Sequence, residues 1–386
     1  MRDAVIAGVG MHRFGRWDDK TDLDLAYEAI VEALGDADVA WDEVQAVAAG
    51  KVRAGSVAGN RVWAMGGATG IPIVNVENAC ATAGSALRLC CQWVSAGFYD
   101  ICVAVGMDKM PRHFITTITP EKDFDYWRWA LTGIPNPGYW AIDCNRYMTC
   151  YGMTAETLVQ VAVKNKKHGA LNPKAWYQKE VTPEQVLASP MVVEPLRQFM
   201  ICTPDEGAAA AVVTTRAIAR ARSGRRPVTV AAAQLASRVH GSPASDSVDL
   251  AYTPAPDALP VTTLAARRAY EEAGVGPSDL EVVELQDASA WNEIEYMEAL
   301  DLCGPGEAPA LVASGATALG GRLPINPSGG LLSRGEPPGA SQLGQVYEMV
   351  LQLRGDAGPR QVEGARVGLC HVYGGFGNSS VLVLKR

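Results

Sequence analysis

The segment from residue 71 to residue 96 constrains the fold of this chain most. It begins with an apolar, β-branched run, Ile71 to Val76, which predicts a buried strand. The residues from Ala81 to Ala96 follow almost at once and are nearly all apolar, which predicts a helix that is buried on every side. Such a helix must be enclosed by other elements. The segment therefore predicts a large α/β protein whose sheet is mostly parallel and covered on both faces.

Strand and helix patterns alternate along the rest of the chain, which favours two similar α/β halves with a long insertion in the first. Helical periodicity is clear over residues 22–34 and 154–167, and apolar strand-like runs occur at both ends of the sequence. The predicted organisation is a first half over residues 1–112 and 201–250, an insertion over 113–200, and a second half over 251–386. The further strands predicted are 4–9, 44–49, 100–106, 208–214, 228–232, 280–285, 365–372 and 379–384, and a further helix is predicted at 265–273.

The insertion is rich in tryptophan, tyrosine and proline, as in Tyr126–Trp129 and Pro135–Trp140. Long insertions of this kind cover active sites and shape their specificity. The aromatic stretch from Phe124 to Tyr151 suggests a large apolar or ring-containing substrate, although core packing explains the same composition nearly as well.

Composition excludes several classes of function. The chain has 386 residues, of which 48% are hydrophobic and 20% charged, and its net charge is −8, so no basic face for nucleic acid is expected. No apolar run reaches the length of a membrane span, and the sequence enters a strand directly, without the pattern of a signal peptide. Nine scattered cysteines without a CxxC pair favour reduced thiols in a cytoplasm and no metal site in this chain.

One thiol, that of Cys80, lies at the turn between the strand and the buried helix. Unpaired N–H groups and the positive end of the dipole at a helix N-terminus stabilise a thiolate. The neighbours Ala79, Ala81, Ala83 and Gly84 are small and leave room for a carbonyl group beside the sulfur. Cys80 is therefore a candidate acyl-accepting nucleophile. The alternative is a small core hydrophobe, as most buried cysteines are.

Two polar residues, Gln286 and Asp287, lie between a predicted strand and a predicted helix. Ligands of α/β proteins bind at this end of the strands, so both are candidate site residues. The alternative for Asp287 is the N-cap of the following helix. Further along the chain, Asn326 is followed by Gly329 and Gly330, which favours either close backbone approach to a ligand or a tight turn.

Two titratable residues complete the set of candidates. Glu336 lies between Gly335 and the pair Pro337–Pro338, which restrains its backbone, and the alternative is an exposed glutamate in a turn.

His371 ends a predicted strand ahead of Gly374–Gly375, and it is the only one of the five histidines in such a position. A histidine there can accept a proton from a thiol or a carbon acid near neutral pH, although strand histidines also serve structural roles.

Taken together, these segments resemble the thiolase superfamily, and especially the sterol-carrier-protein-like thiolases and lipid-transfer thiolase homologues. Residues 78–86, Asn-Ala-Cys-Ala-Thr-Ala-Gly-Ser-Ala, are similar to the nucleophile block. Residues 188–197 and 205–210 are similar to the region that re-enters the core after the loop domain. Residues 326–330 with 335–340 are similar to the block that reads Gly-His-Pro-x-Gly-Ala in thiolases. The resemblance covers nearly the whole chain.

The resemblance implies a thiolase fold, in which two βαβαβαββ halves form a five-layered αβαβα arrangement with a loop-domain insertion, and a homodimer as the smallest unit. It implies an acyl-CoA substrate, coenzyme A as acyl carrier, and Cys80 as the residue that holds the acyl group. By alignment of the glycines the second acid/base group falls on His371, with Cys370 as the alternative, and Gln286 falls where an oxyanion-hole group would lie. The positions implied for binding substrate and CoA are Asn326, Gly329, Gly330, Gly339, Tyr373, Gly374 and Gly375.

The sequence departs from the thiolase pattern at two places. Glu336 occupies the position of the histidine that helps to bind the thioester oxygen and to activate the cysteine. An ionised carboxylate cannot donate a hydrogen bond to an oxyanion, and losing one such donor costs roughly 3 kcal/mol of transition-state stabilisation. Glu336 is thus protonated, or acts as a base, or serves a reaction other than ordinary thiolysis. In the last block, His371, Val372 or Tyr373 replaces the expected cysteine or asparagine.

Three functions follow as hypotheses. The first is a degradative thiolase that cleaves a bulky 3-oxoacyl-CoA through an acyl group on Cys80. The second is a retro-aldolase acting on a β-hydroxyacyl-CoA of the steroid side-chain type, for which Glu336, Asp287, His371 and Tyr373 would supply the acid and the base. Relatives of both kinds work with a small accessory subunit that carries a zinc ribbon and an OB fold. The third is a non-catalytic carrier of lipids or acyl-CoA.

Overall fold

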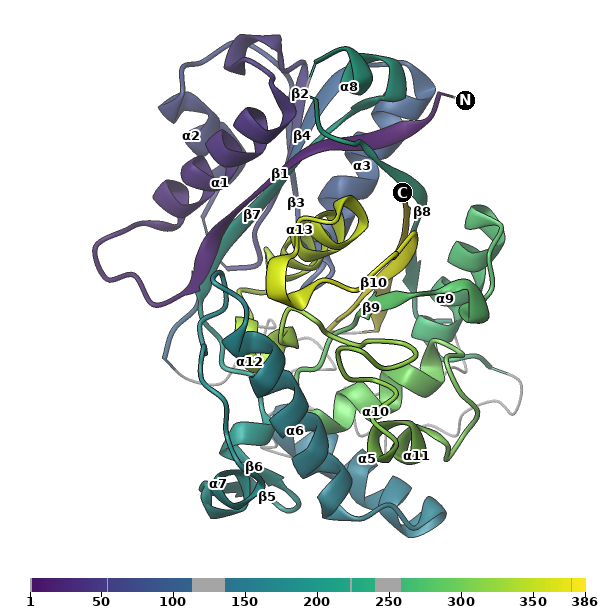
Figure 1. Ribbon diagram of the computed structural model, residues 1–386. Coiled ribbons are helices and arrows are strands. Elements are labelled where there is room, and N and C mark those ends of the chain that lie inside the picture. Colours follow the sequence, from purple (N-terminus) through teal and green to yellow (C-terminus); the bar gives the residue numbers. More distant parts are fainter. Residues whose placement is uncertain (1, 54, 113–135, 223, 240–257, 376) are drawn as a thin grey trace.

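A computed structural model of the chain describes residues 2–53, 55–112, 136–222, 224–239, 258–375 and 377–386. Its central feature is a nine-stranded mixed sheet with the strand order β3-β2-β4-β7-β1-β8-β11-β10-β9, and two further short strands, β5 and β6, pair with each other (Figure 1). The strands are β1 (Ala4–Gly15), β2 (Ala46–Gly50), β3 (Ile73–Val76), β4 (Ile101–Lys109), β5 (Met191–Val193), β6 (Leu196–Arg197), β7 (Glu206–Thr215), β8 (Val228–Ser237), β9 (Val282–Glu284), β10 (Val367–Gly374) and β11 (Asn378–Lys385).

The helices lie on the faces of this sheet and in the insertion. They are α1 (Asp22–Ala37), α2 (Ala58–Met65), α3 (Thr82–Ala96), α5 (Asn136–Tyr151), α6 (Ala155–Ala170), α7 (Pro183–Ala188), α8 (Arg216–Arg222), α9 (Val261–Ala273), α10 (Ala290–Ala299), α11 (Ala308–Ala313), α12 (Gly330–Arg334) and α13 (Ser341–Arg354). None of the helices in the described ranges combines the length and the apolar character that crossing a bilayer needs.

The order of the strands confirms the two similar halves. The first half has the order β2-β4-β7-β1, and the second repeats it as β9-β10-β11-β8. In both, the first pair is parallel and the next two are antiparallel. A parallel bridge between Val283 and Ile325 in the second half takes the place of β3. The halves meet where Val5 and Ile6 of β1 pair with β8.

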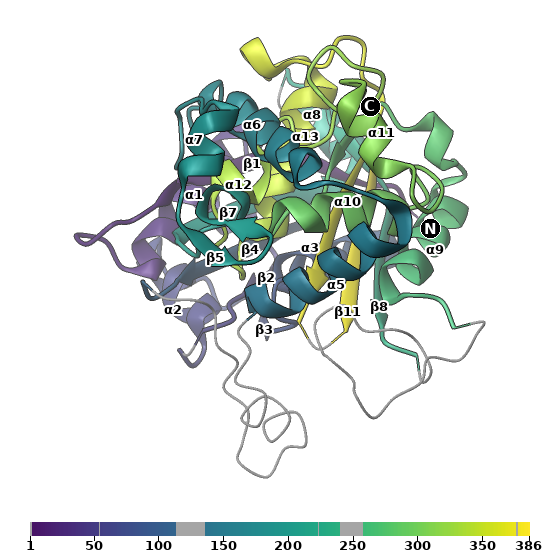
Figure 2. The same ribbon diagram turned by 90° about the horizontal axis from the view of Figure 1, so that it is seen from below.

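The buried side chains divide the molecule into layers. Helices α3 and α13 pack together between the strands of the two halves, with Leu87 and Val94 facing the same cluster as Val346 and Met349. Helices α1 and α2 cover the outer face of the first half, and α9 and α10 cover the outer face of the second (Figures 1 and 2). The predicted five-layered αβαβα arrangement of two halves is therefore confirmed.

Two details of the predicted fold are wrong. The sheet is parallel only at its two ends and antiparallel through its middle, because the last strands of each half join it by antiparallel pairing. The strand predicted as buried at residues 71–76 is β3, which lies at the edge of the sheet. Val74 on it is 40% exposed, since among the described strands β2 is its one partner. The first two turns of α3 are buried as predicted, but Gln92 and Ala96 near its end are exposed.

The insertion contributes α5, α6, α7 and the β5-β6 pair between β4 and β7, which are neighbours in the sheet. These elements gather at one end of the molecule, over α10 and α12 (Figures 1 and 2). Helix α6 extends a few residues beyond its predicted end. The aromatic stretch at Tyr126–Trp129 lies outside the described residues.

Candidate active site

The nucleophile turn between β3 and α3 holds Cys80 just ahead of the first residue of the helix. Two hydrogen bonds of Asn78 fix the turn to the start of α3. The N–H of Asn78 donates to Thr82 Oγ1 (2.8 Å), and its Nδ2 donates to Ser85 Oγ (2.9 Å). Ala79 has a left-handed conformation with φ of 47°, which a small side chain tolerates best. The residue Cys80 is partly exposed at this sharp turn.

The carboxylate of Glu336 is the centre of the site. Its Oε1 accepts a hydrogen bond from Gln286 Nε2 (2.9 Å), and its Oε2 accepts one from Cys202 Sγ (2.9 Å). The thiol of Cys80 lies beside the same carboxylate and interacts with it. One buried acid therefore contacts two thiols and one amide, and these four residues come from four separate parts of the chain.

Gln286 is oriented by the end of β10. Its Oε1 accepts the N–H of Tyr373, so its amide nitrogen faces Glu336, to which it donates, and it interacts with the thiol of Cys80. An amide N–H that points at the reactive sulfur is suited to stabilise an oxyanion formed there. This geometry supports the role that the sequence resemblance implies for Gln286.

The charges around Cys80 contradict one prediction. The helix N-terminus was expected to stabilise a thiolate, but burial and the adjacent Glu336 carboxylate raise the pKa of Cys80 well above its usual range. Burial likewise raises the pKa of Glu336, although the hydrogen bonds from Cys202, Gln286 and Cys80 oppose that shift. Cys80 therefore rests as a neutral thiol beside a base that can take its proton.

The segment that enters β7 holds Glu336 in place. Thr203 O accepts the N–H of Glu336 (3.4 Å), and Glu336 O accepts the N–H of Asp205 (3.4 Å). Gly335 has φ of 101°, and a Cβ there would lie 1.7 Å from the Asp205 carboxylate, so only glycine allows this approach. Sequence reasoning missed Cys202, because it lies between the blocks 188–197 and 205–210 and one cysteine among nine carries no pattern.

Asp287 is placed away from this group, although it follows Gln286 directly. Its Oδ1 accepts the N–H of Leu331 (2.6 Å), and its Oδ2 accepts the N–H of Leu332 (3.3 Å) and Asn165 Nδ2 (2.8 Å). The carboxylate thus binds the start of α12 and not the helix that follows it, whose N-cap is Ser289. Its contacts support a structural role, which holds the helix that leads to Glu336.

We expect Asp287→Ala to lower the free energy of unfolding by on the order of 3 kcal/mol or more, because three donors in the interior lose their acceptor. Urea denaturation at pH 7 measures this change. Asp279→Ala is the matched control, since Asp279 accepts a backbone N–H of Gly276 at the surface (2.8 Å), and it should cost about 1 kcal/mol. Equal losses in the two variants would contradict the structural role of Asp287.

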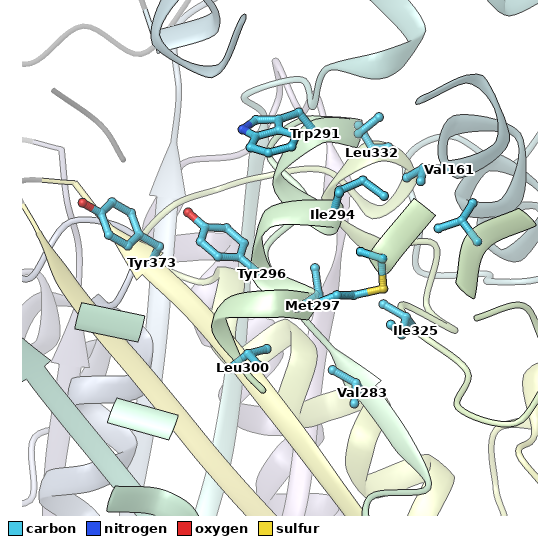
Figure 3. Packing of buried hydrophobic residues seen from close by; sticks show 14 of the residues in the cluster. Val161, Val283, Trp291, Ile294, Tyr296, Met297, Leu300, Ile325, Leu332 and Tyr373 are labelled. Atoms are coloured by element: carbon cyan, nitrogen blue, oxygen red, sulfur yellow. The ribbon is translucent and has the colours of Figure 1, made fainter. Parts of the chain in front are cut away.

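His371 also lies apart from Glu336 and Cys80. Its Nε2 is 3.2 Å from Thr262 Oγ1, and its ring packs edge-on against Tyr296 with centroids 4.6 Å apart. Figure 3 shows Tyr296 beside Tyr373 on this face of β10. Cys370 points to the opposite face, into the cluster around α3 and α13. Among the described residues no hydrogen bond joins His371 or Cys370 to the Glu336 carboxylate, so neither is placed as the second acid/base.

The burial of His371 predicts a pH-dependent stability. Burial lowers the pKa of His371 to about 3, from 6.5 for the free side chain, so between these values the unfolded state binds a proton that the folded state does not. The free energy of unfolding should fall by up to about 1.4 kcal/mol per pH unit below pH 6.5 through this group. We expect His371→Gln to have a smaller loss between pH 6.5 and pH 5 in urea denaturation. An unchanged slope would show that His371 charges in the folded protein.

The residues implied for binding substrate and CoA have varied positions. Asn326 is fully buried, with its Oδ1 accepting the N–H of Leu285 (2.9 Å) and its Nδ2 donating to Glu293 (3.0 Å). At Gly330 a Cβ would lie 2.2 Å from Asp287, and at Gly329 one would lie 2.6 Å from Gly169. These three residues thus shape the loop that leads to Glu336.

The other glycines implied for binding are Gly339, Gly374 and Gly375. The N–H of Gly339 donates to Asp108 Oδ2 (2.6 Å), a buried carboxyl whose pKa burial raises to about 6. At Gly374 a Cβ would lie 2.6 Å from the backbone oxygen of Asn78, so glycine lets the end of β10 approach this turn. Gly375 O accepts a hydrogen bond from Asn378 Nδ2 (3.0 Å).

A cavity of about 710 Å³ opens beside the carboxylate cluster. Cys202 and Ile201 line it together with Trp176, Arg16 and Arg112. One wall of the cavity is apolar and another carries the two arginines. The thiol of Cys202, which donates to Glu336, lies on its surface. In the part of the chain that the structure describes, no three His, Cys, Asp or Glu side chains are grouped to hold a metal ion.

Comparison with known proteins identifies the family of the chain. The family model "Thiolase, N-terminal domain" matches residues 4–216, and "Thiolase C-terminal domain-like" matches residues 242–386. The chain belongs to the thiolase family.

Relatives of similar length support an acyl-CoA acyltransferase. The acetyl-CoA acetyltransferase of Methanothermobacter thermautotrophicus is 36% identical over 392 residues, which cover 99% of each chain. The benzoylsuccinyl-CoA thiolase subunit BbsB of Thauera aromatica is 34% identical over 381 residues, which cover 97% of this chain and 95% of that one. Human sterol carrier protein 2 is 34% identical over all of this chain and 72% of its own length.

Two solved structures resemble the fold. The Ltp2-ChsH2(DUF35) aldolase has a TM-score of 0.87 and 26% identity, over 99% of this chain and 97% of that chain. The Acat5 thiolase from Ascaris suum in complex with coenzyme A has a TM-score of 0.72 and 16% identity over both whole chains, and this likeness concerns the fold alone.

Proposed function

We propose that the protein is a degradative thiolase, which cleaves a bulky 3-oxoacyl-CoA through an acyl group carried on Cys80. The observation that carries this proposal is the contact of the Cys80 thiol, at the start of α3, with the Glu336 carboxylate and the Gln286 amide. A nucleophile, a base and an oxyanion donor are the three groups that acyl transfer to a thiol requires.

In the first half of the reaction, the Cys80 sulfur attacks the 3-oxo carbon and its proton passes to Glu336. Gln286 Nε2 donates to the oxyanion that forms. The bond between C2 and C3 then breaks, the acyl group stays on Cys80 as a thioester, and C2 takes a proton to release acetyl-CoA or propionyl-CoA. In the second half, the thiol of coenzyme A loses its proton, attacks the thioester and restores the Cys80 thiol.

This scheme gives Glu336 a role that differs from that of the thiolase histidine. The carboxylate cannot donate to the oxyanion, but it accepts hydrogen bonds from two thiols and the amide. Its role is therefore that of a base, and the amide of Gln286 supplies the donor. Because the carboxylate raises the pKa of Cys80, proton transfer to Glu336 must accompany attack by the sulfur.

The substrate class rests on the cavity and on one relative. The apolar wall formed by Ile201, Val192 and Trp176 suits an extended or ring-containing acyl group. Arg16 is bonded to Glu206 and to backbone oxygens, so the more exposed Arg112 would meet the phosphates of coenzyme A. BbsB, at 34% identity, is named for benzoylsuccinyl-CoA, an aromatic acyl-CoA.

We further propose a homodimer that works with an accessory subunit. Among the described strands, β3 forms an edge of the sheet and exposes Val74, which pairing with a second copy would cover. The name of the Ltp2-ChsH2(DUF35) structure pairs a chain similar to this one with another protein, which supports a partner subunit here.

Retro-aldol cleavage of a β-hydroxyacyl-CoA is the second candidate, because the aldolase structure resembles this chain over 99% of its length. In that reaction no acyl group is held by the enzyme. Of the groups expected to serve it, Asp287 and His371 are bonded elsewhere. Glu336, which accepts a hydrogen bond from Gln286, remains as the base for this reaction. Tyr373 contacts Gln286 through its backbone N–H, and its phenol, which stacks on Tyr296, would have to serve as the acid.

Mass spectrometry of the intact protein distinguishes the candidates. The protein is mixed with a 3-oxoacyl-CoA that carries an aromatic acyl group, quenched in acid and weighed, and the modified peptide is then mapped. Thiolysis predicts a mass increase equal to the acyl group, located on Cys80. Release of a ketone or aldehyde from a β-hydroxyacyl-CoA without any adduct favours the aldolase. Binding without turnover of either substrate favours a carrier.

A further inference from the structure

A second thiol, that of Cys202, contacts the same carboxylate as the nucleophile. Cys202 Sγ donates to Glu336 Oε2 at 2.9 Å, while the Oε1 atom is occupied by Gln286. Cys202 is only 6% exposed, and the surface that it retains lines the 710 Å³ cavity. The sulfur therefore faces the buried acid on one side and a space for ligand on the other.

The backbone around Cys202 is held rigidly. Its N–H donates to Ala288 O at 2.9 Å, and the neighbouring Ile201 forms an antiparallel bridge with Ser289. These contacts fix the segment before β7 to the one that carries Gln286. The position of the sulfur is thus determined by the fold and not by a mobile loop.

Thiolysis requires a second acid/base residue besides Glu336, which takes the proton of Cys80. One group must protonate C2 when the carbon–carbon bond breaks, and the thiol of coenzyme A must later lose its proton. His371 and Cys370, the candidates from the sequence, face Tyr296 and the central helices. We propose that Cys202 is this second acid/base residue, which is a role that rests on the proposed function.

Glu336 passes protons between the two thiols, so that both are protonated again after one turnover. In the first half, the proton of Cys80 moves to Glu336 as the sulfur attacks, and the Cys202 thiol gives its own proton to C2. The proton on Glu336 then crosses to the Cys202 thiolate, which is 2.9 Å away. In the second half, Cys202 transfers its proton to Glu336 and takes the proton of coenzyme A. Glu336 finally returns a proton to Cys80 as the acyl group leaves.

The surroundings of Cys202 suit this sequence. Burial and the Glu336 carboxylate raise the pKa of the Cys202 thiol well above its usual range, so it holds a proton at neutral pH. A thiol in that state can donate to a carbanion. Because both thiols contact one carboxylate, a proton that leaves Cys80 can reach Cys202 through Glu336, and the reverse transfer is equally direct.

Exchange of the C2 hydrogens of acetyl-CoA and propionyl-CoA with D2O tests the proposal, because this exchange requires the second acid/base. The whole protein should catalyse it, and NMR follows the loss of the proton signal. In Cys202→Ala we expect the exchange rate to fall by on the order of 10²-fold or more. With acetyl-CoA as the acyl donor, the adduct on Cys80 should still form, because coenzyme A leaves as a thiolate and needs no acid. Cys370→Ala, which removes a buried thiol far from the carboxylate, should exchange at the normal rate.

Cys202→Ser separates catalysis from positioning. A serine hydroxyl donates the same hydrogen bond to Glu336, but it is a much weaker acid than a thiol. If Cys202 acts as the acid/base, exchange in Cys202→Ser stays as low as in the alanine variant. Exchange restored by serine, or retained in Cys202→Ala together with the adduct, would overturn this role and leave the thiolase function standing. A wild-type protein with neither adduct nor exchange would overturn both.

Discussion

Replacing Cys80 with alanine should abolish the acyl adduct and lower the turnover of a 3-oxoacyl-CoA by on the order of 10⁴-fold or more. No other thiol can take over its function. Cys202 contacts the same carboxylate, but it does not lie at the start of a helix, and Gln286 donates to the Cys80 sulfur. The nucleophile and its oxyanion donor are therefore specific to one position. Turnover and intact mass, measured on the same sample, check the prediction.

The matched control is Cys90→Ala, on the same helix. Cys90 is fully buried among the side chains of α3 and the sheet, so its removal affects stability and not the site. Cys80→Ala should change the free energy of unfolding by less than about 1 kcal/mol, because the residue is partly exposed. Full activity in Cys80→Ala, with a β-hydroxyacyl-CoA as the substrate, would instead establish the aldolase.

The sequence predicts the outline of the site well, because the site is built where apolar strands end. Cys80, Gln286 and Glu336 each lie in a short block that follows a strand or precedes a helix, and their convergence follows from the topology of two similar halves. What each side chain contacts cannot be read from such blocks. Asp287 adjoins Gln286 in the sequence, but alternation along the backbone turns it to α12.

Neighbouring positions on β10 show the same limit. Residues on a strand alternate between its faces, so Cys370 faces the central helices while His371 faces α9 and α10. An alignment of glycines places His371 near the site in sequence without fixing the direction of its side chain. The residue whose backbone N–H contacts Gln286 is Tyr373, two positions further on.

Helix α13 illustrates what hydrophobic periodicity misses. This central helix has no predicted counterpart, because its buried face includes Ser341, Gln342, Gln345 and Glu348. These polar side chains find partners in the interior, as when Gln345 Nε2 donates to His371 O at 2.9 Å. A helix that is buried through hydrogen bonds lacks the apolar stripe from which helices are predicted.

Replacing Glu336 with glutamine should have opposite effects on two reactions of the same thiol. Removing the negative charge beside Cys80 lowers the pKa of the thiol, because the carboxylate is one of the causes that raise it. The pH of half-maximal alkylation of Cys80 by iodoacetamide should therefore move down. Turnover should nevertheless fall about 10³-fold, since an amide cannot accept the proton of the attacking thiol.

The pH dependence provides a second measurement on the same variant. Burial raises the pKa of Glu336 above 4.5, and only the deprotonated form can act as a base. In the wild type, kcat/KM should fall as the pH decreases through that raised pKa, and this acid limb should be absent in Glu336→Gln. Glu336→Asp is the matched control, because it keeps a carboxyl group on a shorter side chain. Its kcat/KM should be lower than that of the wild type but should still fall at low pH. Faster alkylation together with faster turnover in Glu336→Gln would mean that the carboxylate only restrains Cys80, and the basic role of Glu336 would have to be given up.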